Sequence, residues 1–268
     1  GLLEPTNGRI TVDGLDLRTD TNAVKAKLGL VPQELALYPT LSARDNLDFF
    51  GGIYGLGGKH LQERVDAMLE MVELTERADE AIETYSGGMK RRVNIAGGLL
   101  HQPEVLFLDE PTVGVDPQTR NAIFEGVEEL NRAGMTVIYT THYMEEAQRL
   151  CHRAAIIDEG QIVALDTPSA LIRGLGSGIL VLGLEDPEAG AGLGRVRTVA
   201  DQVTELPTVK STTHENANLK IETIRFQEAL MGILEITNQQ DVRITSMEKW
   251  EPNLENVFLH LTGKRLRE

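Results

Sequence analysis

The stretch VLFLDEPT at residues 105–112 decides the fold class of this 268-residue chain. Its four consecutive apolar residues are typical of a strand buried on both faces of a parallel sheet. Asp109 and Glu110 follow at the carboxyl end of that strand, which is where open α/β sheets bind their ligands. Two carboxylates there suit hydrolysis, because one can hold Mg²⁺ while the next polarises an attacking water. An Asp-Glu pair is also common in ordinary loops, so this stretch alone leaves both interpretations open.

The segments around this stretch predict an α/β domain. Apolar runs at 28–31 and 136–139 predict further strands, and the second run is also expected to be buried on both faces. Residues 118–132 have a helical pattern and complete a strand–helix–strand unit. Residues 41–83 predict a helical insert that begins with Ser42 as a cap and continues with apolar residues at helical spacing. A short strand at 9–12 and a hairpin at 154–157 and 162–165 complete the expected elements.

Beyond GLGSG at 174–178, which is the best linker candidate, the pattern predicts a second and smaller unit. Its expected elements are a strand at 179–184, a helix at 196–206, strands at 208–213 and 218–222, a helix at 226–239, a strand at 242–248 and a helix at 253–261. The first six elements have the β-α-β-β-α-β order of a ferredoxin-like unit. We therefore expect two domains, one at 1–172 and a small α+β domain at 179–268.

The net charge, the cysteine count and the length of the apolar runs indicate which kinds of partner and compartment suit this chain. The formal net charge is −15, from 41 acidic and 26 basic residues, which argues against a general electrostatic grip on nucleic acid. The single cysteine, Cys151, cannot form an intrachain disulfide and favours a reducing compartment. No apolar run approaches the roughly 20 residues of a membrane-spanning helix. Work at a membrane would therefore require a partner protein.

A glycine-containing motif, YSGGM at 85–89, opens a helical stretch and suits phosphate binding. Gly87 and Gly88 let the backbone approach a ligand closely, and the helix N-terminus behind them offers free N–H groups. Ser86 adds a hydroxyl group. The ordinary alternative is a loop with an N-cap serine and glycines that serve flexibility.

Two more polar residues stand at the ends of predicted strands. His142 lies directly after the run at 136–139, and this position favours contact with a γ-phosphate over the usual role of a solvated histidine. Gln33 ends the run LVPQ at 30–33 and is uninformative by itself.

Taken together, the order of these motifs resembles the ATPase domain of ABC transporters over residues 1 to about 172. The resemblance matches Gln33 to the Q-loop glutamine, residues 85–89 to the signature motif and residues 105–109 to the Walker B strand. It also matches residues 114–116 to the D-loop. Met89 stands where glutamine is commonest in the family, and Val115 stands where leucine is commonest.

The resemblance implies roles for the residues within one subunit. Asp109 and Gln33 would serve Mg²⁺, Glu110 would activate water as catalytic base, and His142 would orient the γ-phosphate of ATP. The implied fold is a P-loop NTPase-type α/β domain with a helical subdomain at about 41–83.

Other roles implied by the resemblance concern a second ATPase subunit in a head-to-tail dimer, most simply a homodimer. Ser86, Gly87 and Gly88 would contact the γ-phosphate held by the partner subunit. Asp116 would couple the two sites across the interface.

A phosphate-binding loop of the form Gly-x-x-x-x-Gly-Lys-Ser/Thr does not occur in the sequence. The nearest match is GGKH at 57–60, but Ile53 stands where the first glycine of the pattern is required and His60 stands where Ser or Thr is required. This stretch also lies within the helical insert. In the family this loop immediately precedes a segment similar to residues 1–8. The resemblance therefore implies that the first strand and the phosphate loop would precede Gly1. We expect the 268 residues alone to bind ATP poorly and to show no measurable ATPase activity.

The carboxyl-terminal stretch EPNLENVFLHLTG at 251–263 resembles that of bacterial drug and antibiotic exporters with a separate ABC-2-type transmembrane permease. This implies an ATP- and Mg²⁺-dependent subunit held at the cytoplasmic face of the cell membrane by the permease. Phe49, Phe50 and Tyr54 are candidate permease contacts, or they belong to the core of the insert. Two alternatives remain: a non-transport ABC ATPase of translation or DNA repair, and a non-catalytic ABC-like interaction protein.

Overall fold

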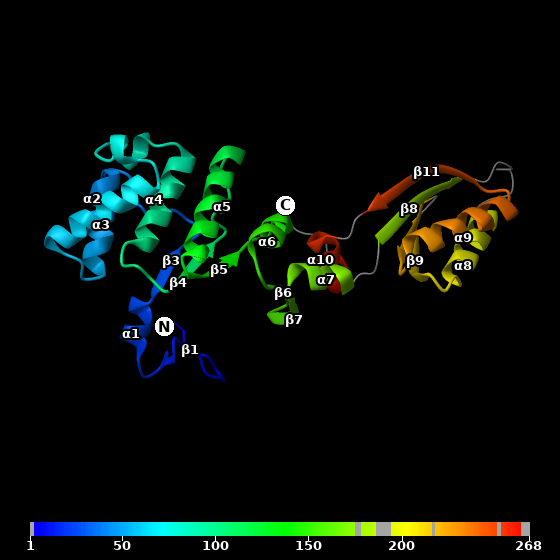
Figure 1. The fold of residues 1–268 in the computed structure, drawn as a ribbon, viewed down its shortest axis with the longest axis horizontal. Coiled ribbons are helices and arrows are strands. Elements are labelled where there is room, and N and C mark those ends of the chain that lie inside the picture. Colours follow the sequence, from blue (N-terminus) through cyan, green and yellow to red (C-terminus); the bar gives the residue numbers. More distant parts are fainter. Residues whose placement is uncertain (1–2, 175–177, 186–193, 216–217, 251–252, 264–268) are drawn as a thin grey trace. The chain divides into compact units, whose positions relative to one another are not determined.

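The computed structural model describes residues 3–174, 178–185, 194–215, 218–250 and 253–263. Its contacts divide the chain into two compact units, Gly1–His142 and Tyr143–Glu268, which are described separately (Figure 1). Residues 175–177 of the predicted linker and residues 251–252 of the carboxyl-terminal motif lie outside the described residues.

A three-stranded parallel sheet lies at the centre of the first unit. Its strands are β3 (Leu28–Val31), β4 (Val105–Asp109) and β5 (Thr136–Thr140), in that spatial order. All three strands are confirmed at the positions that the apolar runs predicted. Because the strands are parallel, their carboxyl ends meet at one edge of the sheet.

Two helices cover one face of this sheet, α4 (Gly87–Leu99) and α5 (Pro117–Arg132). Leu106 and Leu108 of β4 are fully or almost fully buried and belong to one core with residues of both helices. These include Val93 of α4 and Ile123 of α5. The packing fixes the amino ends of both helices relative to the strand that carries Asp109.

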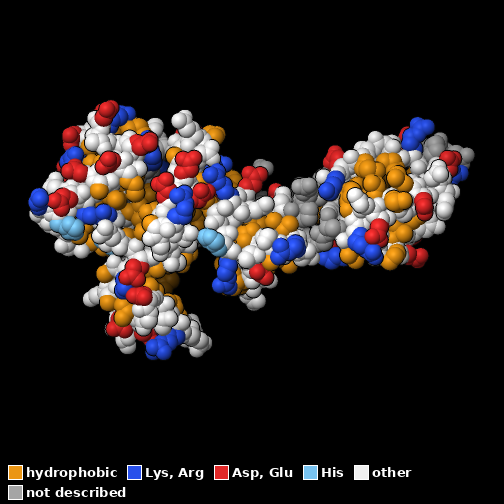
Figure 2. Space-filling view, in the orientation of Figure 1, with side chains coloured by type: hydrophobic (Ala, Val, Ile, Leu, Met, Phe, Trp, Pro, Cys, Tyr) orange, Lys and Arg blue, Asp and Glu red, His pale blue; other side chains and the backbone are white. Residues whose placement is uncertain are grey.

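The helical insert is confirmed, with α2 (Ala43–Ile53), α3 (Gly58–Met71) and two 3₁₀ turns, η1 (Thr75–Arg77) and η2 (Ile82–Thr84). Ser42 caps α2 as predicted: its hydroxyl oxygen accepts from the Asp45 N–H, and the Asp45 carboxylate accepts from the Ser42 N–H. Leu47 and Leu69 are fully buried and join the core of the sheet. Figure 2 shows acidic and basic side chains interspersed over the exposed face of this insert.

The prediction that β5 is buried on both faces is wrong. Val137 and Tyr139 are half-buried against the core, but Ile138 is 44% exposed. Leu30 of β3, which shares a cross-strand row with Ile138 through Phe107, is 60% exposed. Helices α4 and α5 pack on the face formed by Leu106 and Leu108, so the alternate row stays accessible in the described part of the chain. An apolar run thus identifies the strand but not which of its faces are covered.

The amino-terminal segment forms a small hairpin and a short helix. β1 (Thr11–Val12) pairs with β2 (Leu15–Asp16) through a turn in which Asp13 and Gly14 both have positive φ. Helix α1 (Thr21–Ala26) then leads to β3.

One part of the second unit is built around a hairpin. β6 (Ala154–Asp158) pairs with β7 (Gln161–Asp166) across Glu159-Gly160, as predicted. Three helices pack together near it: α6 (Met144–Leu150), α7 (Pro168–Gly174) and α10 (Leu254–Thr262). Ile156, Leu254 and Val257 form their buried core. The carboxyl-terminal helix therefore contacts residues outside the predicted 179–268 domain, and that domain boundary stays a prediction.

The other part of the second unit is a four-stranded antiparallel sheet with two helices. Its elements are β8 (Gly178–Glu185), α8 (Gly194–Thr204), β9 (Val209–Glu215), β10 (Asn218–Thr223), α9 (Phe226–Gln239) and β11 (Arg243–Trp250). This is the element order that the sequence predicted, and the strands lie in the order β11-β8-β10-β9. Among the described residues of the whole chain, no helix is both long enough and apolar enough to cross a membrane.

Candidate active site

The carboxyl ends of the three parallel strands bring Gln33, Glu110 and His142 together. Gln33 Nε2 donates a hydrogen bond to Glu110 Oε2 over 3.2 Å. His142 Nδ1 lies 3.1 Å from the same oxygen. Because a carboxylate oxygen can only accept, both nitrogens act as donors when they carry a proton toward it. The Glu110 side chain is 26% exposed, which leaves access for a water molecule.

The backbone of Glu110 is unusual, because its φ is +44° in the left-handed region. A residue other than glycine is uncommon there, and the conformation costs about 1–3 kcal/mol unless the surroundings hold it. The Glu110 N–H donates to both the carbonyl oxygen and the hydroxyl oxygen of Thr140, at 3.1 and 3.2 Å. The end of β5 therefore holds the backbone turn at Glu110, the residue that directly follows β4.

Asp109 is the last residue of β4, and it is exposed. Its Oδ1 accepts a 2.5 Å hydrogen bond from the Thr140 hydroxyl, and its Oδ2 has no hydrogen bond to any other described residue. No group of three or more His, Cys, Asp or Glu side chains with metal-site geometry occurs in the described ranges. A site with one free carboxylate oxygen and a nearby amide fits Mg²⁺, which keeps several waters and uses one or two carboxylates together with substrate phosphates.

A second group of predicted residues lies at the start of α4. Ser86 is the N-cap, and its hydroxyl oxygen accepts from the Met89 N–H over 3.2 Å. Ser86 and Gly87 are exposed, so the first N–H groups of the helix are accessible to an anion. Gly88 is buried, and a Cβ there would lie only 2.5 Å from Thr119 Oγ1. Glycine is therefore required at position 88 by the packing of α4 against α5.

Asp116 joins this second group because it caps α5. Its carboxylate accepts from the N–H groups of Gln118 and Thr119, each at 3.0 Å, and from the Thr119 hydroxyl at 2.6 Å. The Thr119 hydroxyl, more than any other neighbour, lowers the pKa of Asp116 below its ordinary value of 3.8. Thr119 thus contacts Asp116 and packs against Gly88 at the same time.

The structure adds residues to which the sequence analysis gave no role. Arg91 is buried in α4 and donates to the carbonyl oxygens of Pro32 and Gln33, at 2.9 and 2.7 Å. Asn94 Oδ1 accepts from the Ala36 N–H over 3.2 Å. The available signal was their three-residue spacing, which places both on one face of the helix that begins at the signature motif. Helix α4 therefore carries Gly87 at its amino end and holds the loop of Gln33 through Arg91 and Asn94.

This chain is similar to known proteins over most or all of its length. The sequence profile of the family described as ABC transporter matches residues 1–113. The linearmycin resistance ATP-binding protein LnrL of Bacillus subtilis (strain 168) is 44% identical over 270 residues, which cover this whole chain and 85% of that protein. The daunorubicin resistance ATP-binding protein DrrA2 of Streptomyces coeruleorubidus is 37% identical, covering 98% of this chain and 80% of that protein. The Nod factor export ATP-binding protein I of Cupriavidus metallidurans is 34% identical, covering 100% and 83%.

Solved structures agree with these sequence relatives. The ATP-binding subunit of an ABC transporter superposes with a TM-score of 0.58 at 28% identity, over 65% of this chain and 72% of that chain. A dimeric post-hydrolysis state of the ATP-binding cassette MJ0796, bound to ADP and Pi, superposes with a TM-score of 0.55 at 27% identity. The superposition covers 62% of this chain and 75% of that chain. The predicted P-loop NTPase-type fold class is confirmed. The chain belongs to the family of ATP-binding proteins of ABC transporters.

Proposed function

We propose that this protein hydrolyses ATP to power the export of drugs, antibiotics or other small amphipathic compounds through a separate ABC-2-type permease. The names of its relatives support this class of cargo, since they concern linearmycin resistance, daunorubicin resistance and Nod factor export. The permease would hold the subunit at the cytoplasmic face of the cell membrane.

One observation carries the enzymatic part of the proposal: Gln33 and His142 both meet the same oxygen of Glu110. Glu110 acts as the general base, and it takes the proton from the water that attacks the γ-phosphate of ATP. Gln33 and His142 hold its carboxylate in place between turnovers. With nucleotide present, His142 turns its ring N–H from the Glu110 carboxylate toward the γ-phosphate, because the γ-phosphate carries more negative charge than the carboxylate.

Asp109 and Gln33 are the proposed residues for Mg²⁺. When bound, this ion neutralises charge on the β- and γ-phosphates. Asp109 offers the free Oδ2, while Thr140 fixes the carboxylate through Oδ1. Gln33 offers its amide oxygen, since its Nε2 donates to Glu110.

The second group of residues supports a head-to-tail dimer, most simply a homodimer. Ser86, Gly87 and Gly88 would bind the γ-phosphate held by the partner subunit with a hydroxyl group and the first N–H groups of α4. Asp116 would contact the partner across the interface, and its own capping hydrogen bonds keep it ionised.

The aromatic residues of the insert differ in their suitability as permease contacts. Phe50 is half-buried and packs against the core, and Tyr54 stacks on His101 at a centroid distance of 3.6 Å. Phe49 is 44% exposed and meets Tyr38 edge to face at 5.1 Å. Phe49 and Tyr38 therefore form the better candidate contact.

The test replaces Glu110 by glutamine in the complete subunit, expressed together with its permease. Glu110→Gln removes the base and should lower phosphate release by at least about 100-fold, while ATP binding is retained. Cells carrying the variant should accumulate a fluorescent anthracycline. Glu83→Gln is the matched control, because Glu83 is exposed and lies outside both groups of site residues.

The outcomes separate this proposal from its rivals. Hydrolysis that survives Glu110→Gln would overturn the role of the base. A wild-type complex without ATPase activity would indicate a non-catalytic interaction protein. ATPase activity with no change in cellular drug content would favour a non-transport ABC ATPase.

A further inference from the structure

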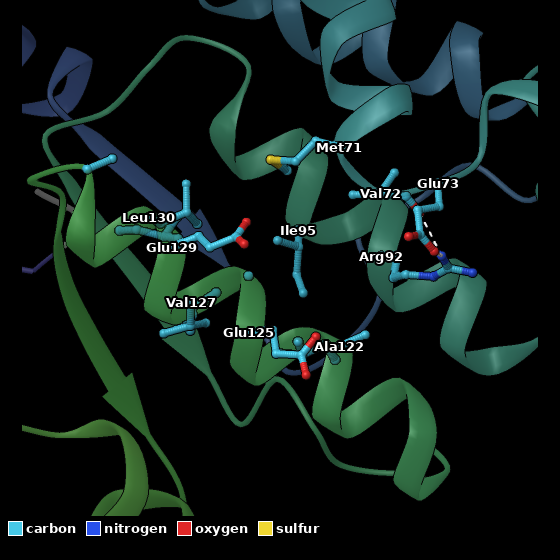
Figure 3. A pocket seen from close by; sticks show the side chains of 15 residues that line it. Met71, Val72, Glu73, Arg92, Ile95, Ala122, Glu125, Val127, Glu129 and Leu130 are labelled. Atoms are coloured by element: carbon cyan, nitrogen blue, oxygen red, sulfur yellow. Dashed lines mark hydrogen bonds and ion pairs between the residues drawn. The ribbon is translucent and has the colours of Figure 1, made fainter.

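A cavity of about 460 Å³ lies in the first unit, between the carboxyl end of α3, one face of α4 and the length of α5 (Figure 3). This volume falls in the range of small-molecule sites, roughly 300–1,000 Å³. Its apolar lining is formed by Met71, Val72, Ile95, Leu106, Leu108, Ile123, Val127 and Leu130. Leu106 and Leu108 of β4 belong to this lining and are fully or almost fully buried.

The cavity is separate from the proposed active site. On α4, Arg91 and Asn94 face the loop of Gln33, whereas Arg92 and Ile95 line the cavity. A ligand in the cavity would therefore contact neither Glu110 nor the first N–H groups of α4.

The polar rim of the cavity is negatively charged. Glu125 and Glu129 stand one turn apart on α5, and both are exposed (Figure 3). Within the described ranges, neither carboxylate has a hydrogen bond or an ion pair. Arg92 is already engaged, since it donates to the Val72 carbonyl oxygen over 2.7 Å and lies 3.7 Å from the Glu73 carboxylate. Two uncompensated carboxylates thus face an apolar chamber.

We propose that this cavity binds a small lipophilic amine carrying one positive charge. Its apolar body would displace water from the accessible part of the lining, Met71, Ile95 and Leu130, and this burial supplies most of the affinity. Its ammonium group would lie at the rim between Glu125 and Glu129, where attraction is strongest at low ionic strength. The net charge of −15 further favours a cation over an anion.

Three naphthalene probes of similar size test the chemistry of the ligand. 2-Naphthylmethylammonium, 2-naphthylmethanol and 2-naphthoate are titrated into the complete protein and followed by NMR of its Ile, Leu and Val methyl groups. The cation should shift the methyl signals of Leu106, Leu108 and Ile123 and bind at least fivefold more tightly than the alcohol at 20 mM salt. That preference should fall below twofold at 0.5 M NaCl, because the rim charges are screened.

Variants test the location. Gly126 lines the cavity on α5, and a Cβ there meets nothing within 4 Å. Gly126→Leu should fill the space and weaken binding more than tenfold, whereas Gly126→Ala should stay within twofold of the wild type. Glu125→Gln with Glu129→Gln should weaken the cation at least fivefold and leave the alcohol unchanged. Glu83→Gln is the charge control.

Several results would overturn the proposal. These are equal binding of the three probes, methyl shifts confined to other parts of the protein, or unchanged affinity in Gly126→Leu. Circular dichroism melting of each variant verifies that it is folded. If Gly126→Leu does not fold, the location of the site is tested by the variant that combines Glu125→Gln with Glu129→Gln.

Discussion

Thr140 contacts both acidic residues of the active site. Its hydroxyl group donates to Asp109 Oδ1 and accepts from the Glu110 N–H, and its carbonyl oxygen accepts from the same N–H. One side chain therefore orients the proposed Mg²⁺ ligand and supports the left-handed turn of the proposed base. Thr140 is a positioning residue, because it acts through Asp109 and Glu110.

Replacing Thr140 by valine should impair the use of Mg²⁺. The variant loses a hydrogen bond to a charged group, worth about 1.5–3 kcal/mol, so we expect at least a tenfold rise in the Mg²⁺ concentration that gives half-maximal ATPase activity. The measurement is a Mg²⁺ titration of phosphate release by the complete subunit with its permease. Thr140→Ser should restore the wild-type dependence. Thr136→Val, at the exposed start of the same strand, is the control, and an unchanged Mg²⁺ dependence in Thr140→Val would refute this role.

Much of the candidate site could be predicted at the residue scale. Gln33, Glu110 and His142 follow three strands of one parallel sheet, and this topology alone brings their side chains to one edge. The role of Thr140 could not be predicted, because its hydrogen bonds depend on the register between β4 and β5. The positive φ of Glu110 likewise has no local sequence signal, since surrounding contacts impose it.

At the scale of elements, β3 and α4 pack unusually closely through two glycines. A Cβ on Gly29 would collide with the carbonyl oxygen of Gly98 and would lie 2.8 Å from Pro103 Cγ. A Cβ on Gly98 would lie 2.7 Å from Val31 Cγ2. This close approach lets Arg91 of α4 reach the carbonyl oxygens of the loop after β3.

Gly29→Ala should separate the strand from the helix. The added methyl group overpacks the contact, so we expect the free energy of unfolding to fall by about 1–3 kcal/mol. Gly126→Ala is the matched control, because its methyl group meets nothing within 4 Å and it should raise the stability of α5 by about 0.5–1 kcal/mol. Urea denaturation measures both. Equal effects of the two substitutions would show that the close approach does not matter.

Predictability also differed among elements for physical reasons. The long helices α5 and α9 can be predicted within a few residues, because their apolar residues recur at helical spacing over several turns. Strand β8 can be predicted as well, because it is a continuous apolar run. Helices α6 and α7 were not predicted, since each has only seven residues and too few turns to show a period. The exposure of Ile138 in β5 could not be predicted, because the sequence of one strand does not show which face of the sheet the helices cover.

At the scale of the whole molecule, charge is the property that the sequence establishes without any knowledge of the fold. The net charge is −15, and several ion pairs, such as Arg44 with Asp66, have at least one exposed partner. Exposed pairs contribute little, about 0–1 kcal/mol each. Repulsion among the excess carboxylates therefore remains as an unfavourable contribution to the compact state.

Salt should consequently stabilise this protein. Raising NaCl from 20 mM to 0.5 M shortens the screening length from roughly 20 Å to about 4 Å, which weakens long-range repulsion more than short ion pairs. We expect the melting temperature to rise by about 2–6 °C, since 1 kcal/mol corresponds to roughly 2–4 °C in a protein of this size. Differential scanning calorimetry at pH 7 measures the change in every transition, with glucose at equal osmolality as the control for solvent effects. A melting temperature that falls with salt would mean that local ion pairs outweigh the repulsion of the net charge.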